Sequence, residues 1–386
     1  MPTEEKSKPA PVLDFQPVSA ADWEALVFRE MEGKHFPDAY AALGIGGMDH
    51  FPHPGDDDAS AAAFPLWERG GWELGETVPV SSGNWDAANR RALEALEMGA
   101  DSLRFVLPSS PAPLSGLPRL WQGIEPAVVP LYFSMEGDGR PLPAALGTAL
   151  LQWSAVTGRP ATARGGWTGW PAHSDTSDPD ELAFIRDTLH PALPYFRTFS
   201  LERGGVASAE TLVPTYARLL TQAVEMFHRH ESCCPGFDRF SRRTTVTLSL
   251  GSDFFLEVAG LRAFRLLWRQ LCRAYGLELA VMPLVDVYLA ETGDTMAEAD
   301  RLIRDTVRSA AAVLGGADRL TVLPTDLSAP EYGAVERRHA RNVQHILRLE
   351  AFLDQVSDPL AGSLFIERLT GNIAQLAWDS FRQSQC

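Results

Sequence analysis

Short apolar or alternating runs recur between longer segments of helical spacing from about residue 85 onward. We predict strands at residues 102–107, 129–135, 161–164, 195–201, 245–250, 277–284 and 320–323, with a weaker eighth at 364–366. The segments with helical spacing of apolar residues are 86–98, 142–156, 212–228, 255–274, 296–314 and 335–356. Strands and helices that alternate every ~30–45 residues are typical of parallel strands joined by helical crossovers.

This alternation predicts an α/β fold, a (β/α)8 TIM barrel, over residues 85–386. A doubly wound open sheet is the alternative, because strand counts from sequence err by one or two. Residues 1–84 lack the alternation, and we predict an extended N-terminal arm there, part of it flexible. The chain is therefore expected to consist of an arm, 1–84, and a barrel, 85–386.

The predicted arm contains one stretch with a clear pattern. Residues 1–20 are rich in Pro, Lys and Glu, whereas Trp23, Leu26, Val27 and Met31 form an apolar stripe at helical spacing. So short a segment cannot enclose that stripe by itself. We therefore expect the arm to lie on another surface, either the barrel or a partner.

Residue types at the ends of the predicted helices fit the same division. Thr295-x-x-Glu298 is a capping box that opens a helix, and Gly315-Gly316 supplies the left-handed end of that helix. Asp253 follows a predicted strand, which is where a barrel places active-site loops. The same residue makes equal sense as a helix N-cap, and we favour that interpretation.

Composition excludes several classes of function. The 386 residues are 45% hydrophobic and carry a net charge of −16, which argues against a nucleic-acid surface because phosphate binding needs clustered Lys and Arg. No apolar run reaches the ~18 residues of a membrane span, and residues 1–11 lack the apolar core of a signal peptide. The four cysteines have neither zinc spacing nor C-x-x-C spacing, so we expect reduced thiols and a cytoplasmic protein.

Local motifs identify no catalytic, cofactor-binding or metal-binding residue. The glycines near residues 44–47 and 165–166 lack the G-x-G-x-x-G order, and no G-x-S-x-G occurs. His50 and His53, with the aspartates at 49 and 56–58, could hold a metal, but a solvated acidic loop is the favoured interpretation. The remaining histidines that we considered are expected at helix ends or on helix surfaces: His228, His230, His339 and His345.

Four segments, in this order, resemble the methylmalonyl-CoA mutase family. Residues 253–268 are similar to N-F-F-x-E-x-A-K-x-R-A-x-R-x-L-W, and residues 323–326 to the start of L-P-T-D-F-S. Residues 338–344 are similar to R-x-A-R-N-x-Q, and residues 358–370 to D-P-W-x-G-S-Y-Y-V-E-x-L-T. The resemblance covers roughly residues 65–382 and is firm after residue 195. Because these segments have the composition of packed helices and turns, they support the fold and do not establish activity.

The segments that the resemblance makes catalytic depart from the family pattern. Catalysts carry R-P-W-T-I-R-Q-Y; alignment on Trp72 puts Gly70 and Gly75 at the Arg positions and Thr77 at the Tyr position. Ser200 stands where the family places the His that hydrogen-bonds the thioester carbonyl. The segment that corresponds to R-T-H-S-Q-T-S-G-W is 283–291, which we expect to form a largely apolar lining.

These departures resemble the small, non-catalytic subunit of heterodimeric mutases. The resemblance implies a longer catalytic partner chain that binds adenosylcobalamin and acyl-CoA, with no cofactor bound by this chain alone. In agreement, none of the nine histidines has the D-x-H order of the cobalt-ligating motif, and we expect no C-terminal corrinoid domain. The alternatives are an active acyl-CoA mutase barrel that uses a corrinoid domain on a separate chain, and a stand-alone barrel of unrelated function.

Overall fold

The structure is a computed structural model of the chain. It describes residues 19–30, 43–45, 48–50, 66–67, 70–81, 84–108, 116–135, 147–152, 164–167, 179–203, 209–289, 298–324 and 333–385. A short antiparallel pair, β1 (Leu43–Ile45) and β2 (Met48–His50), belongs to a separate two-stranded sheet.

One parallel sheet organises the described chain. Its strands are β3 (Glu73–Pro79), β4 (Ser102–Leu107), β5 (Leu131–Met135), β6 (Gly165–Trp167), β7 (Phe196–Arg197), β8 (Phe199–Arg203), β9 (Thr244–Leu248), β10 (Leu284–Leu289) and β11 (Arg319–Val322). They pair in the order β7-β6-β5-β4-β3-β11-β10-β9-β8. Because only Thr198 separates β7 from β8, these two are parts of one strand that pairs with β6 at its start and with β9 further on. The sheet thus has eight strand positions in cyclic order, which confirms the TIM barrel.

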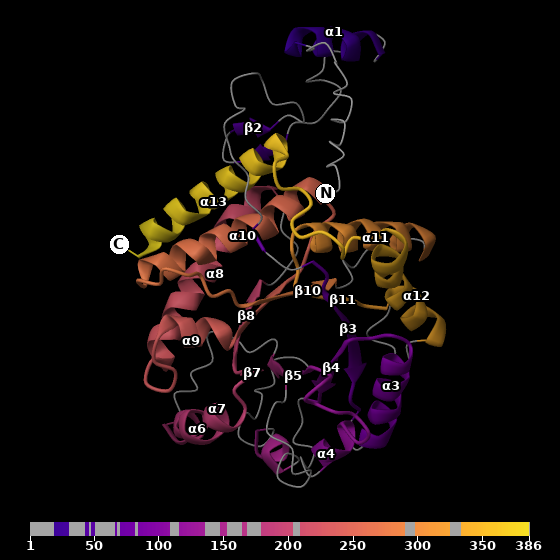
Figure 1. The fold of residues 1–386 in the computed structure, drawn as a ribbon, viewed down its shortest axis with the longest axis vertical. Helices are drawn as coiled ribbons and strands as arrows, with labels where there is room; N and C mark the ends of the chain where they lie inside the picture. The colour runs from indigo at the N-terminus through magenta and orange to yellow at the C-terminus, as the bar shows by residue number, and fades with distance from the viewer. Residues whose placement is uncertain are drawn as a thin grey trace, which may run out of the picture.

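Helices surround the strands (Figure 1). After α1 (Ala20–Glu30) they are α3 (Trp85–Glu97), α4 (Leu117–Leu120), a helical stretch at 147–152, α6 (Pro179–Phe184), η3 (Ile185–Leu189), α7 (His190–Ala192), α8 (Ala209–His230), α9 (Phe237–Arg242), α10 (Phe254–Ala274), α11 (Glu298–Leu314), α12 (Ala334–His345), η4 (Ile346–Glu350) and α13 (Leu364–Ser384). The last helix, α13, packs outside the barrel against α10 and α8.

The predicted eighth strand at 364–366 is wrong, because these residues form the first turn of α13. Their short apolar run continues at helical spacing through Leu369, Ile373 and Ala377, all fully buried. The missing strand is β3, which lies among the residues assigned to the arm and pairs with β4 and β11. Its sequence has few apolar residues, so neither an alternating nor a continuous apolar run indicated a strand there.

Two further predicted strands are displaced along the chain. The segment 277–283 is a connection in which Leu279 is 84% exposed, and β10 begins only at Leu284. The strand predicted at 161–164 is replaced by β6 at 165–167, while residues 161–163 lie outside the described residues. In both places the predicted segment lies just before the residues whose backbone pairs with the neighbouring strands.

The predicted helix-end signals are confirmed where the structure describes them. The carboxylate of Asp253 caps α10 by accepting a hydrogen bond from the Leu256 backbone N–H at 3.0 Å. Gly316, just after α11, has φ +89°, the left-handed conformation that ends helices. Thr295 lies outside the described residues. The short helix of the arm exists as α1, in which Leu26 and Phe28 are 40% and 46% exposed.

His190 lies beside the break between β7 and β8. Its Nε2 is 3.0 Å from Thr198 Oγ1, and its carbonyl oxygen accepts a hydrogen bond of 2.9 Å from Arg243. Burial, together with the charge of Arg243, lowers the pKa of His190 to about 3. The imidazole is therefore neutral in the folded protein.

This neutral imidazole predicts acid sensitivity. Between pH 6.5 and about 3 the unfolded chain binds the proton that folded His190 refuses, so stability falls as pH falls through this window. The buried carboxyl of Glu76, whose pKa is raised, acts in the opposite direction. We therefore expect His190→Gln to lose less stability than wild type between pH 7 and 4.5, measured by thermal unfolding. Equal losses in both proteins would contradict this.

Candidate functional site

The barrel interior is lined by charged and hydroxyl side chains. Along each strand, alternate residues face the helices or the interior. On β10, for example, Val285 and Val287 pack in the apolar core against the helices, whereas Asp286 belongs to the polar interior. The described residues with interior positions include Glu73, Gly75, Thr77, Ser102, Arg104, Tyr132, Ser200, Thr245, Thr247, Asp286, Tyr288, Arg319 and Thr321.

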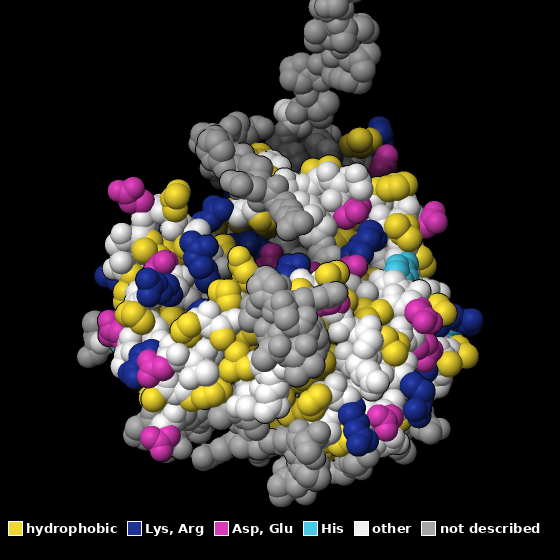
Figure 2. Space-filling view, turned by 60° about the horizontal axis from the view of Figure 1, so that its bottom comes forward, with side chains coloured by type: hydrophobic (Ala, Val, Ile, Leu, Met, Phe, Trp, Pro, Cys, Tyr) yellow, Lys and Arg dark blue, Asp and Glu magenta, His cyan; other side chains and the backbone are white. Residues whose placement is uncertain are grey.

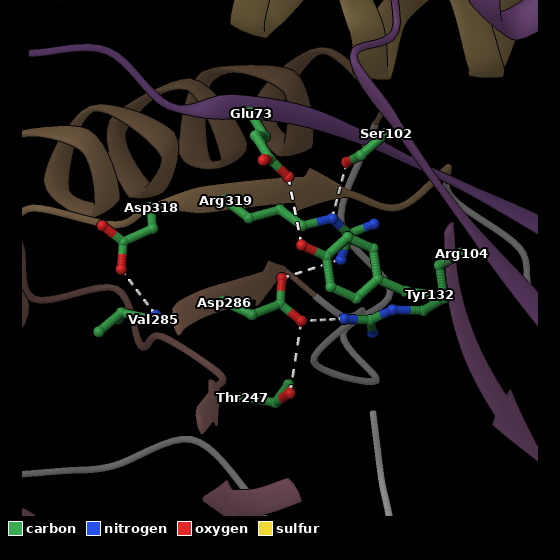
Figure 3. Close-up of polar contacts among 9 residues, drawn as sticks. All are labelled: Glu73, Ser102, Arg104, Tyr132, Thr247, Val285, Asp286, Asp318 and Arg319. Carbon is green, nitrogen blue, oxygen red and sulfur yellow. Dashed lines mark hydrogen bonds and ion pairs between the residues drawn. The ribbon is translucent and has the colours of Figure 1, made fainter. Parts of the chain in front are cut away.

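Asp286 is the centre of this interior (Figure 3). Its Oδ1 accepts a hydrogen bond of 3.0 Å from Arg319 Nη1, and its Oδ2 accepts one from Arg104. Thr247 Oγ1 lies 3.4 Å from the same Oδ2. The three charged side chains are at most 5% exposed, so one buried carboxylate joins two buried guanidinium groups from three strands.

Aromatic rings and a glycine position the two arginines. Arg319 stacks 4.3 Å from the centroid of Tyr132, and Arg104 stacks 4.5 Å from the centroid of Tyr288. Gly75 leaves the space that Arg319 uses. A Cβ at position 75 would collide with Thr321 Oγ1 and lie 2.7 Å from Arg319 Nη2. Glycine is thus required at 75 for this packing.

Glu73 links the interior to a cavity at the mouth formed by the strand N-termini. Tyr132 donates a hydrogen bond of 3.3 Å to Glu73, and Arg164 approaches it at 3.4 Å. Burial raises the pKa of Glu73, although the nearby guanidinium groups oppose the shift. The cavity has about 610 Å³, and its lining includes Gly70, Glu73, Arg164, Arg197, Asp318 and Arg348.

Of the positions that the family pattern makes catalytic, only some lie in the barrel interior. Thr77 on β3 and Ser200 on β8 are interior residues, 9% and 0% exposed. Gly70 instead lies before β3, where a Cβ would collide with the Asp354 carbonyl oxygen. The predicted apolar lining at 283–291 is wrong for the described part, because Asp286 and Tyr288 face inward, whereas Val285 and Val287 face the helices.

Sequence reasoning missed Arg104, Asp286 and Arg319, although a signal was present. Each is the polar member of an alternating run: Ser102-Leu-Arg104, Leu284-Val-Asp286-Val-Tyr288 and Arg319-Leu-Thr321. In an open sheet such alternation would expose the polar face. In a closed barrel it places that face inside, where charges must pair with one another.

The segments that carried the family resemblance hold the barrel wall together. Arg262 of α10 forms a fully buried ion pair with Asp358 and a second, partly exposed one with Glu367 near the start of α13. Asp358 also accepts a hydrogen bond of 2.8 Å from the Leu66 backbone N–H. Its φ of +44° lies in the left-handed region, a strain that these bonds offset. The first and fourth segments are therefore architectural, as their residue types predict.

The segment at 338–344 joins α12 to the start of β3. Arg341 binds both carboxylate oxygens of Glu76, at 2.7 and 2.9 Å. Gln344 Oε1 accepts a hydrogen bond of 3.2 Å from Trp72 Nε1. These contacts fix the first barrel strand to the last barrel helix and so support closure.

Histidines and acidic residues form no metal site in the described part of the chain. No group of three His, Cys, Asp or Glu residues is arranged to hold a metal among the described residues. His228 and His230 lie at the end of α8. The Nε2 atom of His345 lies 3.1 Å from the Met98 carbonyl oxygen. The loop that could hold a metal is not tested, because the side chain of His50 and residues 53 and 56–58 lie outside the described residues.

On the face drawn in Figure 2, the described Lys and Arg side chains are interspersed with Asp, Glu and hydrophobic side chains. Among the described residues, no helix is long and apolar enough to cross a membrane. Cys233, Cys234 and Cys272 are buried free cysteines.

The fold and its interior define a (β/α)8 barrel with a charged, closed core and a C-terminal helix that an ion pair between Glu367 and Arg262 holds against the barrel wall. The family model for methylmalonyl-CoA mutase matches residues 207–385. The chain is 28% identical to the methylmalonyl-CoA mutase small subunit of Porphyromonas gingivalis, over 80% of this chain and 52% of that protein. It is 29% identical to the small subunit of Streptomyces virginiae, over 84% and 55%. Residues 207–385 therefore match the methylmalonyl-CoA mutase family, and the similarity to its small subunits extends over about four fifths of the chain.

Other comparisons set the extent of this likeness. The large subunit of Propionibacterium freudenreichii subsp. shermanii is 30% identical, over 47% of this chain and 25% of that protein. The chain spans about half the length of the small subunits that it matches. A solved structure of Plasmodium falciparum HPPK-DHPS has a TM-score of 0.42 and 11% identity, over 92% of this chain and 55% of that one. A score this low bears on neither fold nor function.

Proposed function

We propose that this chain is the small, catalytically inactive subunit of an adenosylcobalamin-dependent methylmalonyl-CoA mutase and acts by supporting a large catalytic chain. The observation that carries the proposal is the barrel interior. Where the family's catalysts have Tyr and His, this interior has the hydroxyls of Thr77 and Ser200. A hydroxyl cannot act as an acid–base group near neutral pH as imidazole does.

The described residues do not fit adenosylcobalamin. When bound, that cofactor supplies radical chemistry, and the family ligates its cobalt through a His of a separate domain. Three described imidazoles already contact other groups of the chain. His190 contacts Thr198 Oγ1, His230 contacts the Met226 carbonyl oxygen, and His345 contacts the Met98 carbonyl oxygen. No step is therefore assigned to the cofactor on this chain, and we propose that the large chain holds both cofactor and acyl-CoA.

The alternative is an active barrel that borrows a corrinoid domain from another chain. One observation favours it: the 610 Å³ cavity at the strand N-termini, which contains Arg164, Arg197 and Arg348, leaves room for a ligand. The ion-paired interior opposes it, since Arg104, Asp286 and Arg319 occupy the middle of the barrel.

The proposal predicts no isomerisation of methylmalonyl-CoA by the isolated chain and no spectral shift when it is titrated with adenosylcobalamin. Co-expression with the mutase large chain of the same genome should give a co-purifying, active complex. Turnover by the isolated chain supplied with a corrinoid domain would support the alternative.

Variants within the complex separate the two candidates further. Under the proposal, Thr77→Ala and Ser200→Ala leave the kcat of the complex within about twofold, because neither side chain contacts substrate. If this barrel is catalytic, losing a hydrogen bond in the reacting site should cost at least about tenfold. Circular dichroism and thermal unfolding of each variant serve as the control for folding.

A further inference from the structure

The last barrel helix ends in a stretch of exposed apolar side chains. They are Ile346, Leu349, Phe352 and Val356, which are 53%, 60%, 62% and 58% exposed. Met98, at the C-terminal end of the neighbouring helix α3, is 56% exposed, and its carbonyl oxygen lies 3.1 Å from Nε2 of His345. We call Met98 and these four residues the apolar patch. Neighbouring exposed apolar side chains, unlike scattered single ones, mark interaction surfaces.

Buried neighbours hold the apolar patch in place. Leu347 is 6% exposed and belongs to the hydrophobic core, and Leu353 packs against the same core. Arg348 forms an ion pair of 2.8 Å with Asp101 and donates a hydrogen bond to the Trp72 carbonyl oxygen. Because anchored residues alternate with exposed ones, the exposed side chains are held in fixed positions. Such a surface loses little conformational freedom when a partner binds to it.

The backbone of this stretch has two uncommon conformations. η4 is a π-helix, in which the Ala351 backbone N–H donates to the Ile346 carbonyl oxygen at 2.9 Å. Phe352 follows with φ +54°, a left-handed conformation that is unfavourable for a bulky side chain. Burial of the ring does not offset this strain in the isolated chain, because the Phe352 side chain is mostly exposed. π-helical turns and strained residues concentrate at functional sites, which indicates that this ring finds its contacts on another molecule.

The size of a stable interface requires a contact of this kind. The 11-residue helix α1 is about 16 Å long and 10 Å wide, so one face of it covers a few hundred Å² at most. A stable interface takes roughly 800 Å² from each partner. If the arm binds the large chain, the barrel must therefore supply further surface. A second copy of this chain is a poorer occupant, because two chains that each carry a net charge of −16 repel one another.

We propose that the apolar patch is the barrel's own contact with the large mutase chain, and that Phe352 is the aromatic anchor of this contact. The proposal rests on the function proposed above, because that function supplies the partner. Aromatic side chains that fill an apolar pocket near the centre of an interface carry much of its binding energy. The large chain is therefore expected to offer such a pocket to Phe352.

The test measures the Kd between the full chain and the large mutase chain of the same genome by titration calorimetry. Phe352→Asn removes the ring, and Asn adopts the left-handed conformation more readily than Phe. We expect the Kd to rise about 30-fold, as for an aromatic anchor, while the Tm of the isolated chain stays equal or rises. The matched control is Tyr195→Asn, because Tyr195 is also 62% exposed but lies just before β7, across the barrel from β3. Its Kd should stay within about twofold of wild type.

A second variant and two further readouts make the outcome decisive. Leu349→Gln keeps a good helix former and should raise the Kd at least about fivefold. If wild type binds the large chain and both variants bind equally well, the apolar patch is not the contact, whereas the proposed function stands. If wild type forms no complex, the proposed function fails and the contact fails with it.

The remaining outcomes concern folding and self-association. A clear fall in the Tm of isolated Phe352→Asn would assign the ring a structural role and overturn the proposal. Sedimentation of the isolated chain tests for a second copy as the occupant. A wild-type dimer that Phe352→Asn dissociates would assign the apolar patch to self-association and would likewise overturn the proposal.

Discussion

Replacing Asp286 with alanine is expected to lower the free energy of unfolding by about 3–5 kcal/mol, the usual cost of removing one partner from a buried ion pair. Arg104 and Arg319, at 4% and 0% exposure, would then be buried with no carboxylate between them. Such a loss is a large part of the ~5–15 kcal/mol that stabilises a typical protein. Urea unfolding followed by circular dichroism measures it.

Two variants control this experiment. Asp187→Ala removes the carboxylate of a solvent-exposed pair with Arg186 and should leave the unfolding midpoint unchanged. Asp286→Asn keeps an acceptor oxygen but removes the charge, so its loss should be intermediate. A loss below about 1 kcal/mol for Asp286→Ala would mean that the two arginines find other partners and that the interior network is not needed for closure.

The second large effect concerns association through the N-terminal arm, which remains a prediction. If α1 is buried on the large chain, Leu26→Ser with Phe28→Ser should cost about 2–4 kcal/mol of binding, or roughly 30- to 800-fold in Kd. The physical reason is that the exposed apolar surface of Leu26 and Phe28 would be removed from water in the complex. Titration calorimetry with the large chain measures this Kd.

The matched control changes charged residues of the same helix, Arg29→Ser with Glu30→Ser, and should alter the Kd by less than about threefold. Both pairs of variants should keep the circular dichroism of the barrel, because the structure records few contacts between α1 and the sheet. Full affinity after Leu26→Ser with Phe28→Ser would show that α1 is not part of the interface. The proposed partner would then rest on the other evidence alone.

Local pattern predicted most of the barrel. Runs such as 102–107 and 320–323 were recognisable because a strand between helices is buried on the helix side, which imposes apolar alternation. Helix ends at Asp253 and Gly316 were predictable because caps depend on the residue and its immediate neighbours. Two of the segments that resemble the family, 253–268 and 358–370, have the architectural role expected of them, since they supply the contacts between α10 and α13 and the ion pair of Arg262 with Asp358.

The strand β3 was not predictable by the same reasoning. Its residues Glu73, Gly75 and Thr77 are polar or small, and their burial becomes intelligible only when β11 and β4 lie on either side. Glu76 faces outward, where an exposed position would be expected, yet it is 9% exposed and bound to Arg341. Contacts between residues this far apart in sequence leave no periodic trace.

The sequence by itself determined the alternation of strands and helices, the positions of the caps and the resemblance to a family, because each depends on neighbours within about one helical turn or strand. The tertiary structure decided which face of each strand became the interior. Closure of the sheet brought Arg104, Asp286 and Arg319 together from three strands and gave Gly75 its neighbours. A charge in isolation is expected at the surface, and only its partner across the barrel makes burial possible.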